Sequence, residues 1–356
     1  MDKFKILAIN PGSTSTKIAV FEDNNPVFLK TIRHSSEELD KFEKITDQYS
    51  FRKNIIYKEL QEAEVRINEI RAVVGRGGVI RPIPSGVYEV NEEMKHDLTH
   101  SRMQHASNLG GLIADDIASE LPNARAYIAD PVVVDELSDL ARISGHPEFQ
   151  RISIFHALNQ KAVARQHAKS VLRKYEDLNL IVVHLGGGIS VGAHQKGKVI
   201  DVNQALDGEG PFSPERSGTL PAGDLVRMAF SGKYTEKQML RMITGGGGLT
   251  AHCGTNSAYD VEIKAAEGNP HHKLIFEAMA YQVAKIIGSM CPVLKGQVDA
   301  ILITGGMANS KWFVKMIIER VNCIAPVHVY PGEDEMRALV TNGLMVLKGE
   351  IEARIY

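Results

Sequence analysis

Two stretches of the sequence share one pattern, and this repetition limits the folds available to the chain. ILAINPGSTSTKIAV begins at Ile6 and LIVVHLGGGISVGAH begins at Leu180. Each has an apolar strand, one polar residue, a turn of small residues and a second apolar strand. The offset is 180 − 6 = 174 residues, which aligns Asn10 with His184 and Gly12 with Gly186. The repetition therefore predicts two strand–turn–strand units of one design.

The length of the chain and the alternation of its patterns indicate two domains of the α/β class. The chain has 356 residues, which is more than a single hydrophobic core usually holds. Apolar strand patterns alternate with helical periodicity in both halves. We expect a first domain in residues 1–154, completed by a C-terminal helix in residues 337–356, and a second domain in residues 155–336.

Composition and charge exclude several classes of function. The formal net charge is −2, so there is no electrostatic case for binding to nucleic acid or to an anionic membrane. The three cysteines are scattered, which favours a reducing cytoplasm over a secreted disulfide scaffold. The N-terminus lacks a signal-peptide pattern, and we find no stretch approaching the ~20 apolar residues of a membrane span. We expect a cytoplasmic protein with neither nucleic acid nor membrane as a partner.

Three junctions between a strand and small residues are candidate phosphate sites. Backbone N–H groups in the two repeated turns can approach phosphate oxygens, because no bulky Cβ blocks them. A third junction, AILITGGMANS, places Gly-Gly between a strand and a helix, where nucleotides commonly bind. Plain hairpin turns are the alternative interpretation, and no GxxxxGK[ST] motif occurs. The candidate nucleotide-binding residues are Asn10, Ser13, Ser15, Gly186, Gly187, Gly188, Gly305 and Gly306.

In their order along the chain, these three junctions resemble the phosphate and adenosine segments of the actin-like ATPase superfamily. FSPERSGTLPAGDL, residues 212–225, resembles the Arg-Ser-Gly segment of the acetate kinases. Four further stretches are similar to segments of the butyrate kinases, the sister group in that family. They are VGRGGVIRPIPSGVYEVNEEM, QHASNLGG, ADPVVVDEL and RISIFHALNQKAVARQHA. The resemblance extends from Ile6 to about Leu339.

The resemblance implies both a fold and a reaction. The fold would be two actin-like, ribonuclease H-like domains with a cleft for nucleotide and substrate between them. The reaction would be reversible phosphorylation of a short-chain carboxylate, butyrate or a branched relative, by ATP, giving an acyl phosphate and ADP. The implied ligands are ATP or ADP, Mg²⁺ and the carboxylate. We also expect a homo-oligomer, a dimer or larger.

Two arginines and two histidines are the candidate catalytic residues on the cationic side of this reaction. Arg76 lies between a buried strand and two glycines, where its planar fork suits a carboxylate or phosphoryl group. Arg216 lies in the loop PERSGTL and matches the acetate kinase arginine that stabilises the transferring phosphoryl. His184 ends a strand before three glycines, and His156 stands at a junction into a helix. The acetate kinases carry a second histidine four residues later, where this chain has Gln160.

The remaining candidates are a histidine on the substrate side and the acids of a metal site. His105 resembles a substrate-binding histidine, although its spacing to Asn108 is one residue shorter than in the acetate kinases. Asp130, before a proline, is a candidate catalytic residue and, with Asn10, a candidate Mg²⁺ ligand. In YPGEDEMRALV, Asp334 and Glu335 match a pair of adjacent glutamates that lies near the metal in the acetate kinases. The pattern leaves open which of the two serves the metal, and a helix cap is the alternative for Asp334.

Two other functions fit parts of the sequence. An acetate or propionate kinase would differ only in the size of its acyl pocket. A non-metabolic actin-like ATPase that changes shape on ATP binding would share all three nucleotide segments. Such a switch has no need of Arg76 or of PERSGTL near the γ-phosphate, so both favour the carboxylate kinase.

Overall fold

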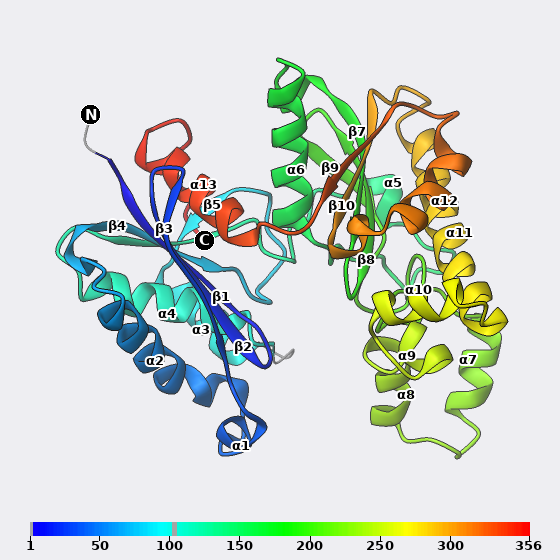
Figure 1. Ribbon diagram of the computed structural model, residues 1–356, viewed down its shortest axis with the longest axis horizontal. Helices are drawn as coiled ribbons and strands as arrows, with labels where there is room; N and C mark the ends of the chain where they lie inside the picture. The colour runs from blue at the N-terminus through cyan, green and yellow to red at the C-terminus, as the bar shows by residue number, and fades with distance from the viewer. Residues whose placement is uncertain (1–2, 102–104) are drawn as a thin grey trace. The chain divides into compact units, whose positions relative to one another are not determined.

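The computed structural model describes residues 3–101 and 105–356. The chain forms two compact units, each built around its own sheet (Figure 1). Unit 1 contains Met1–Val134 and Asp334–Tyr356, and unit 2 contains Asp135–Glu333. Residues 102–104 lie outside the described part of the chain.

Unit 1 is built on a mixed six-stranded sheet with the strand order β3-β2-β1-β4-β6-β5. β1 pairs antiparallel with β2, and β2 with β3, whereas β1, β4 and β6 run parallel. Its strands are β1 (Lys5–Pro11), β2 (Ser15–Glu22), β3 (Asn25–Arg33), β4 (Ile70–Arg76), β5 (Val87–Glu89) and β6 (Arg125–Ala129). Its helices are α1 (Ser36–Leu39), α2 (Tyr49–Glu62), α3 (Glu92–His100), α4 (Asn108–Ser119) and α13 (Glu335–Leu347).

Helices cover both faces of the unit 1 sheet. Leu7 and Ile9 of β1 lie in one core with Leu109 of α4, and α13 packs against β1 and β4 (Figure 1). A Cβ added at Gly343 of α13 would lie 2.7 Å from Val74 Cγ2, so this glycine allows the helix to approach the sheet closely. Burial of both faces explains why β1 and β4 consist of nearly continuous apolar residues.

Unit 2 repeats this design with a five-stranded sheet in the order β11-β10-β7-β8-β9. Its strands are β7 (Asn179–Leu185), β8 (Ile189–Gln195), β9 (Lys198–Val202), β10 (Ala300–Gly305) and β11 (Val327–Pro331). Its helices are α5 (Asp139–Arg142), α6 (Ala157–Ser170), α7 (Ala222–Ala229), α8 (Glu236–Thr244), α9 (Gly248–Cys253), α10 (Ala258–Ala266), α11 (Pro270–Val293) and α12 (Lys311–Val321).

The internal repetition expected from the sequence is present in both register and topology. Adding 174 to the bounds of β1, 5 and 11, gives 179 and 185, which are the bounds of β7. In each unit this strand pairs antiparallel with the next one and parallel with a strand on its other side. Asn10 and His184 therefore occupy equivalent positions, each next to the last residue of its strand.

The long apolar helix of unit 2 is a core element. By length and composition, Pro270–Val293 would be sufficient to span a membrane, contrary to the expectation that no such stretch exists. Phe276, Val283 and Ile287 of this helix lie fully buried in one core with Ile181 and Val183 of β7. Packing against the sheet and against α10 and α12 buries one side of this helix.

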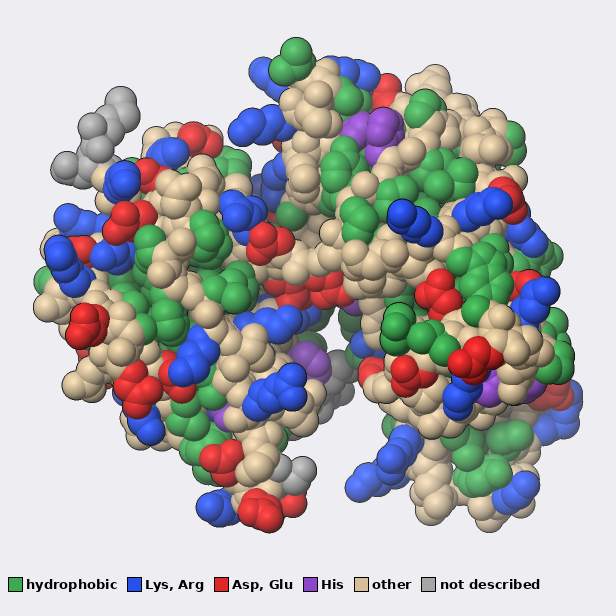
Figure 2. All heavy atoms as spheres, viewed as in Figure 1, with side chains coloured by type: hydrophobic (Ala, Val, Ile, Leu, Met, Phe, Trp, Pro, Cys, Tyr) green, Lys and Arg blue, Asp and Glu red, His purple; other side chains and the backbone are tan. Residues whose placement is uncertain are grey.

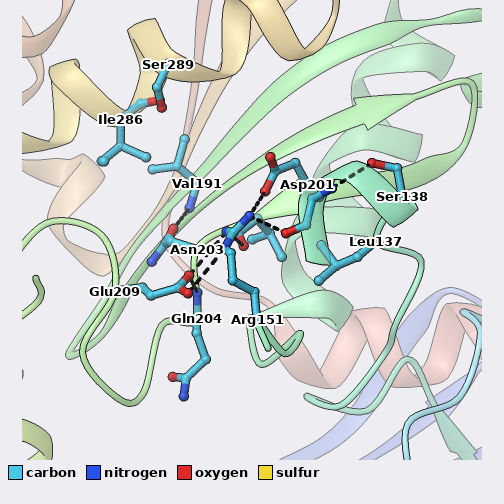
Figure 3. Close-up of polar contacts among 12 residues, drawn as sticks. Leu137, Ser138, Arg151, Val191, Asp201, Asn203, Gln204, Glu209, Ile286 and Ser289 are labelled. Atoms are coloured by element: carbon cyan, nitrogen blue, oxygen red, sulfur yellow. Dashed lines mark hydrogen bonds and ion pairs between the residues drawn. The ribbon is translucent and has the colours of Figure 1, made fainter. Parts of the chain in front are cut away.

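The boundaries between the units lie at 134/135 and 333/334, whereas the sequence suggested boundaries near 154 and 336. Residues 135–154 belong to unit 2 because polar contacts attach them there. Arg151 forms ion pairs with Asp201 (3.0 Å) and Glu209 (3.2 Å), as Figure 3 shows, and Ser138 N donates to Ile200 O (2.9 Å).

The junction into a helix that the sequence predicts at His156 is present, because α6 begins at Ala157. On the face drawn in Figure 2, basic and acidic side chains are interspersed. This face therefore carries no extended basic patch, in keeping with the net charge of −2.

Candidate functional site

Three candidate residues of unit 1 lie at the carboxyl ends of adjacent parallel strands. Asn10 lies near the end of β1, Arg76 ends β4, and Asp130 follows β6. The register pairs Ile9 with Gly75 and Arg76 with Ala129, so all three lie at one edge of the sheet. Ligands of α/β proteins bind at this edge.

Asn10, Arg76 and Glu335 form a buried polar cluster. Arg76 Nη1 lies 3.3 Å from Asn10 Oδ1 and 3.1 Å from Glu335 Oε1. The Asn10 amide nitrogen donates to Glu335 Oε2. Asn10 is 4% exposed and Glu335 is 8% exposed. The remaining guanidinium nitrogens of Arg76 donate no hydrogen bond to any described residue, so half of its fork is available to an anion.

Asp334 and Glu335 have different roles in unit 1. Asp334 is the N-cap of α13: its carboxylate accepts from Arg337 N and from Arg337 Nε, both at 2.9 Å. Its side chain is 59% exposed. Glu335 is the acid that contacts Asn10 and Arg76. Asp334 therefore takes the capping alternative, and Glu335 is the acid that lies beside the other candidate residues.

Asp130 is held by a separate pair of bonds. Its Oδ1 accepts from Ser85 Oγ (2.6 Å) and from Gly86 N (3.0 Å), and the residue is 2% exposed. Its φ of +39° is unfavourable for a residue with a Cβ. A strained, buried carboxylate directly after a parallel strand is typical of functional positions.

His105 lies just before α4, in a turn of its own. Its Nδ1 accepts from Ser107 N at 3.2 Å, so a neutral His105 carries its proton on Nε2. Nearby, Asn108 Oδ1 accepts from Val79 N (2.8 Å) and so fixes the loop after Arg76. Asn108 was not among the site residues predicted from the sequence, although it lies within the QHASNLGG segment.

The β1–β2 turn, which contains Ser13 and Ser15, is organised by an arginine that the sequence analysis did not identify. Arg52 of α2 is 1% exposed and donates to the carbonyl oxygens of Gly12 (2.8 Å), Ser13 (3.1 Å) and Ser15 (3.0 Å). Because C=O and N–H point in opposite directions across a trans peptide, the N–H groups of Ser13 and Thr14 face away from Arg52. Such outward N–H groups form anion-binding turns.

The equivalent β7–β8 turn of unit 2 is made of glycines. Gly186 N donates to Gly188 O (3.1 Å), and Ser213 Oγ donates to Gly187 O (2.7 Å). A Cβ at Gly188 would lie 1.8 Å from Arg216 Nη1, so a glycine is required for Arg216 to reach its position. The structure thus brings Gly188 and Arg216 together.

Arg216 is a partly buried cation with unused hydrogen-bonding capacity. Its Nη1 donates to Ala205 O, and burial lowers the pKa of its guanidinium, an effect that Glu215 opposes. Its Nε is buried and has no partner among the described residues. A buried donor without a partner is costly, so this side chain is suited to an anionic ligand.

His156 and His184 stack on one another in unit 2. Their ring centroids are 4.0 Å apart and the planes are inclined by 21°. His184 Nε2 lies 3.3 Å from Glu333 Oε1, and its buried Nδ1 has no partner among the described residues. Glu333 was not identified from the sequence, although it directly precedes the two acids that were.

A pocket of about 780 Å³ in unit 2 adjoins two of the glycine junctions. Gly186, Gly187 and Gly306 line it, together with Tyr259 and Lys311. Gly305 has a φ of +97°, and a Cβ there would lie 2.3 Å from Leu185 O. The volume of the pocket is that of a typical small-molecule site. Tyr259 and Lys311 were not among the site residues predicted from the sequence.

Comparison with known proteins gives one consistent result. The family model described as the acetokinase family matches residues 150–330. The chain is 58% identical to butyrate kinase 2 of Clostridium acetobutylicum over 355 residues, and 55% identical to a probable butyrate kinase of Phocaeicola vulgatus over 352 residues. Each match covers 99% of both chains.

The solved structures confirm the expected fold of two actin-like domains. An acetate kinase of Porphyromonas gingivalis matches with a TM-score of 0.79 at 17% identity, covering 97% of this chain and 100% of the other. At that identity the likeness concerns the fold alone, whereas the relatives above match over nearly their whole length. This chain belongs to the acetokinase family.

Proposed function

We propose that this enzyme transfers the γ-phosphoryl group of ATP to butyrate or a branched relative, giving an acyl phosphate and ADP. The observation that carries the proposal is the match to butyrate kinases over 99% of both chains. The two glycine and serine turns, the two arginines and the nucleotide-sized pocket support it.

The chemistry requires cationic and neutral donors more than a base. A carboxylate oxygen of butyrate attacks the γ-phosphorus, the bond from that phosphorus to the β–γ bridging oxygen breaks, and ADP leaves with the electron pair. Butyrate is already ionised near pH 7, so no proton has to be removed. The barrier comes from repulsion between two anions, which positive charge on the phosphoryl oxygens relieves.

Each unit contains one arginine whose side chain suits this role. Arg76 uses one nitrogen in the cluster with Asn10 and Glu335, and its free nitrogens would hold the carboxylate or the phosphoryl. Arg216 has a buried Nε without a partner among the described residues, which suits charge that develops on the phosphoryl in the transition state. His156 and His184 would donate to the same oxygens.

The nucleotide fits the residues of each unit. In unit 1, Ser13 and Thr14 present backbone N–H groups from a turn held by Arg52. In unit 2, the pocket beside Gly186, Gly187 and Gly306 would hold the adenosine. Gly305 and Gly306 would allow the adenine ring to lie against the backbone.

Mg²⁺ fits the oxygen donors of unit 1. Glu335 and Asp130 provide buried carboxylates, and Asn10 provides an amide oxygen. Within residues 3–101 and 105–356, no three acidic, histidine or cysteine side chains gather as a metal cluster. Mg²⁺ needs no such cage, because it usually keeps several waters and binds one or two carboxylates and the substrate phosphates. When bound, the ion would neutralise charge on the β- and γ-phosphates.

An ATP-dependent assay that traps acyl phosphates as hydroxamates would test the proposal with acetate, propionate, butyrate, isobutyrate and valerate. We expect kcat/KM to be highest for butyrate or isobutyrate. A maximum at acetate or propionate would make the enzyme an acetate or propionate kinase. ATP hydrolysis without any hydroxamate would instead favour the actin-like switch.

We also propose that the enzyme is a cytoplasmic homo-oligomer. Helix α7 has no buried residue, and Val226, Met228 and Phe230 at its end are 56%, 45% and 88% exposed. Apolar side chains that gather on a surface often mark an interface. Light scattering of the purified enzyme would give the mass in solution, and the mass of a single chain at micromolar concentration would contradict this part of the proposal.

A further inference from the structure

A buried chain of hydrogen bonds in unit 2 ends at the candidate catalytic residue His156. Tyr175 Oη lies 2.7 Å from His194 Nδ1, and His194 Nε2 lies 2.9 Å from Gln160 Oε1. Gln160 Nε2 lies 2.8 Å from Ser190 Oγ, which lies 2.9 Å from His156 Nδ1. Gln160, Ser190 and His194 are all 0% exposed. Buried polar groups must satisfy one another, so the direction of each bond can be derived.

A backbone carbonyl fixes the orientation of the Gln160 amide. Gln160 Nε2 lies 3.1 Å from Ser190 O, which can only accept a hydrogen bond. The amide nitrogen must therefore face Ser190, and Oε1 must face His194. An amide in the opposite orientation would place two carbonyl oxygens against each other.

This orientation determines the proton positions at the inner end of the chain. Gln160 Oε1 can only accept, so His194 Nε2 carries a proton and donates it. His194 is neutral, because burial, and then the charges of Lys161 and Arg165, lower its pKa well below the ordinary value. Its Nδ1 therefore accepts from the Tyr175 hydroxyl. Each polar atom along this part of the chain is then satisfied.

The same logic sets the outer end. Ser190 Oγ accepts from the Gln160 amide, so its own hydrogen is free to donate. Its other bond among the described residues is to His156 Nδ1, and donation there leaves no buried hydroxyl hydrogen unsatisfied. His156 Nδ1 is then an acceptor, and a neutral His156 carries its proton on Nε2.

We propose that Gln160 is a positioning residue that fixes the Nε2-protonated tautomer of His156 through Ser190. His194 and Tyr175 hold the Gln160 amide in the required orientation. A neutral His156 is then held with its N–H on Nε2, and, if the proposed function holds, this fixed tautomer is the form that takes part in the transfer. The acetate kinases that the sequence resembles carry a histidine at the place of Gln160, so they lack this amide.

Nitrogen NMR of ¹⁵N-histidine-labelled enzyme would test the proposal without any substrate. The His156 signals would be assigned by their loss in His156→Gln among the thirteen histidines. We expect Nδ1 of His156 to have the shift of an unprotonated ring nitrogen and Nε2 that of a protonated one. A protonated Nδ1 in the wild-type enzyme would overturn the proposal, whatever the substrate of the enzyme.

Two variants test the role of the chain. Gln160→Met keeps the volume but removes both amide groups, and Ser190→Ala removes the link to His156. In Gln160→Met we expect a mixture of His156 tautomers, seen as intermediate shifts of both nitrogens. In each variant kcat should fall by about tenfold, the effect of one hydrogen bond, with little change in KM for ATP. The double variant should lose no more than either single one, because both break the same chain.

Val163→Ala is the matched control. Val163 lies on α6, is 5% exposed and packs in the core beneath the sheet. Truncating its side chain destabilises unit 2 but removes none of the hydrogen bonds that link Tyr175 to His156. We expect the wild-type tautomer and a kcat within twofold of wild type in this control. A Gln160→Met enzyme with wild-type shifts and wild-type kcat would overturn the proposal. Failure of the hydroxamate assay, in contrast, would count only against the proposed function.

Discussion

The β1–β2 turn of unit 1 and the β7–β8 turn of unit 2 occupy equivalent positions but are stabilised in different ways. In unit 1 the turn is rich in serine and threonine, and the buried guanidinium of Arg52 binds its carbonyl oxygens. In unit 2 the turn consists of glycines and closes on itself through Gly186 N and Gly188 O. The repeated fold therefore does not imply repeated chemistry.

The residues that precede the two turns show the same divergence. Asn10 and His184 are equivalent in the repeat, and each contacts an acid from the segment 333–335. Asn10 meets Glu335 within unit 1, and His184 meets Glu333 within unit 2. An amide with a carboxylate can serve a metal, whereas an imidazole with a carboxylate can hold a donor toward a phosphoryl group.

The largest effect should come from filling the space that the unit 2 turn leaves for Arg216. In Gly188→Ala the new Cβ would lie 1.8 Å from Arg216 Nη1, so the arginine must move. If Arg216 stabilises the transition state, kcat should fall toward the loss in Arg216→Ala, on the order of 10³-fold. Steady-state kinetics with ATP and butyrate varied would measure it.

Gly187→Ala is the control for this prediction. Its Cβ would meet Glu215 Oε2 at 3.5 Å, an ordinary contact. Equal losses of kcat in the two variants would show that the turn tolerates no side chain at all, and that the close approach of Arg216 is not the reason for the glycine. Arg216→Lys should recover little activity, because an ammonium cannot reproduce the planar fork.

The second effect concerns the hydrogen bonds that Arg52 donates to the unit 1 turn. Arg52→Met removes the guanidinium donor from three partly buried carbonyl oxygens, which should lower the free energy of unfolding by about 3 kcal/mol. The KM for ATP should rise more than that for butyrate, because the N–H groups of Ser13 and Thr14 lose their orientation. Urea denaturation and two-substrate kinetics would measure both effects.

Arg66→Met is the matched control, since the Arg66 side chain is 80% exposed and pairs with Glu69 on the surface. We expect its free energy of unfolding to change by less than about 0.5 kcal/mol. A stable Arg52→Met enzyme with unchanged KM for ATP would show that the turn does not need the hydrogen bonds from Arg52, and would remove this difference between the units.

The two turns also show what sequence alone could predict. The strand–turn–strand repeat was visible because apolar runs and small residues are local signals, and Arg76 and Arg216 stood out by their glycine neighbours. Arg52 lies 40 residues after Gly12 on a helix of polar composition. Nothing local indicated that its side chain is buried under a turn, because that depends on how α2 packs.

The three adjacent acids illustrate the same limit. Glu333, Asp334 and Glu335 look alike in the sequence, yet the boundary between the units falls after Glu333 and a helix begins at Glu335. One acid therefore joins His184, one caps the helix and one joins Arg76. Chain direction at a domain boundary determines these roles, and no periodicity in the sequence encodes it.

The third prediction separates the adjacent acids of unit 1. Glu335→Gln keeps the shape but removes the charge beside Asn10, so we expect the Mg²⁺ concentration for half-maximal activity to rise by about tenfold. Asp334→Ala removes an N-cap and should cost about 1 kcal/mol of stability, with unchanged Mg²⁺ dependence. Activity titrated with MgCl₂ at saturating ATP would distinguish them, and the reverse pattern would assign the metal to Asp334.

The smallest effect is the pH dependence of stability that His194 gives to unit 2. Burial lowers the pKa of His194 in the folded state, whereas in the unfolded chain it has the ordinary value near 6.5. Between these two values the unfolded state binds a proton that the folded state does not, so acidification through about pH 6.5 favours unfolding. The contribution of one such histidine is at most about 1.4 kcal/mol per pH unit.

Burial lowers the pKa of His34 in unit 1 in the same direction. Urea denaturation at pH 7.5, 6.5 and 5.5 should therefore show that the free energy of unfolding of the wild type decreases as the pH is lowered. The fall should be shallower in His194→Gln, and an equal slope in both proteins would mean that His194 titrates normally in the folded state.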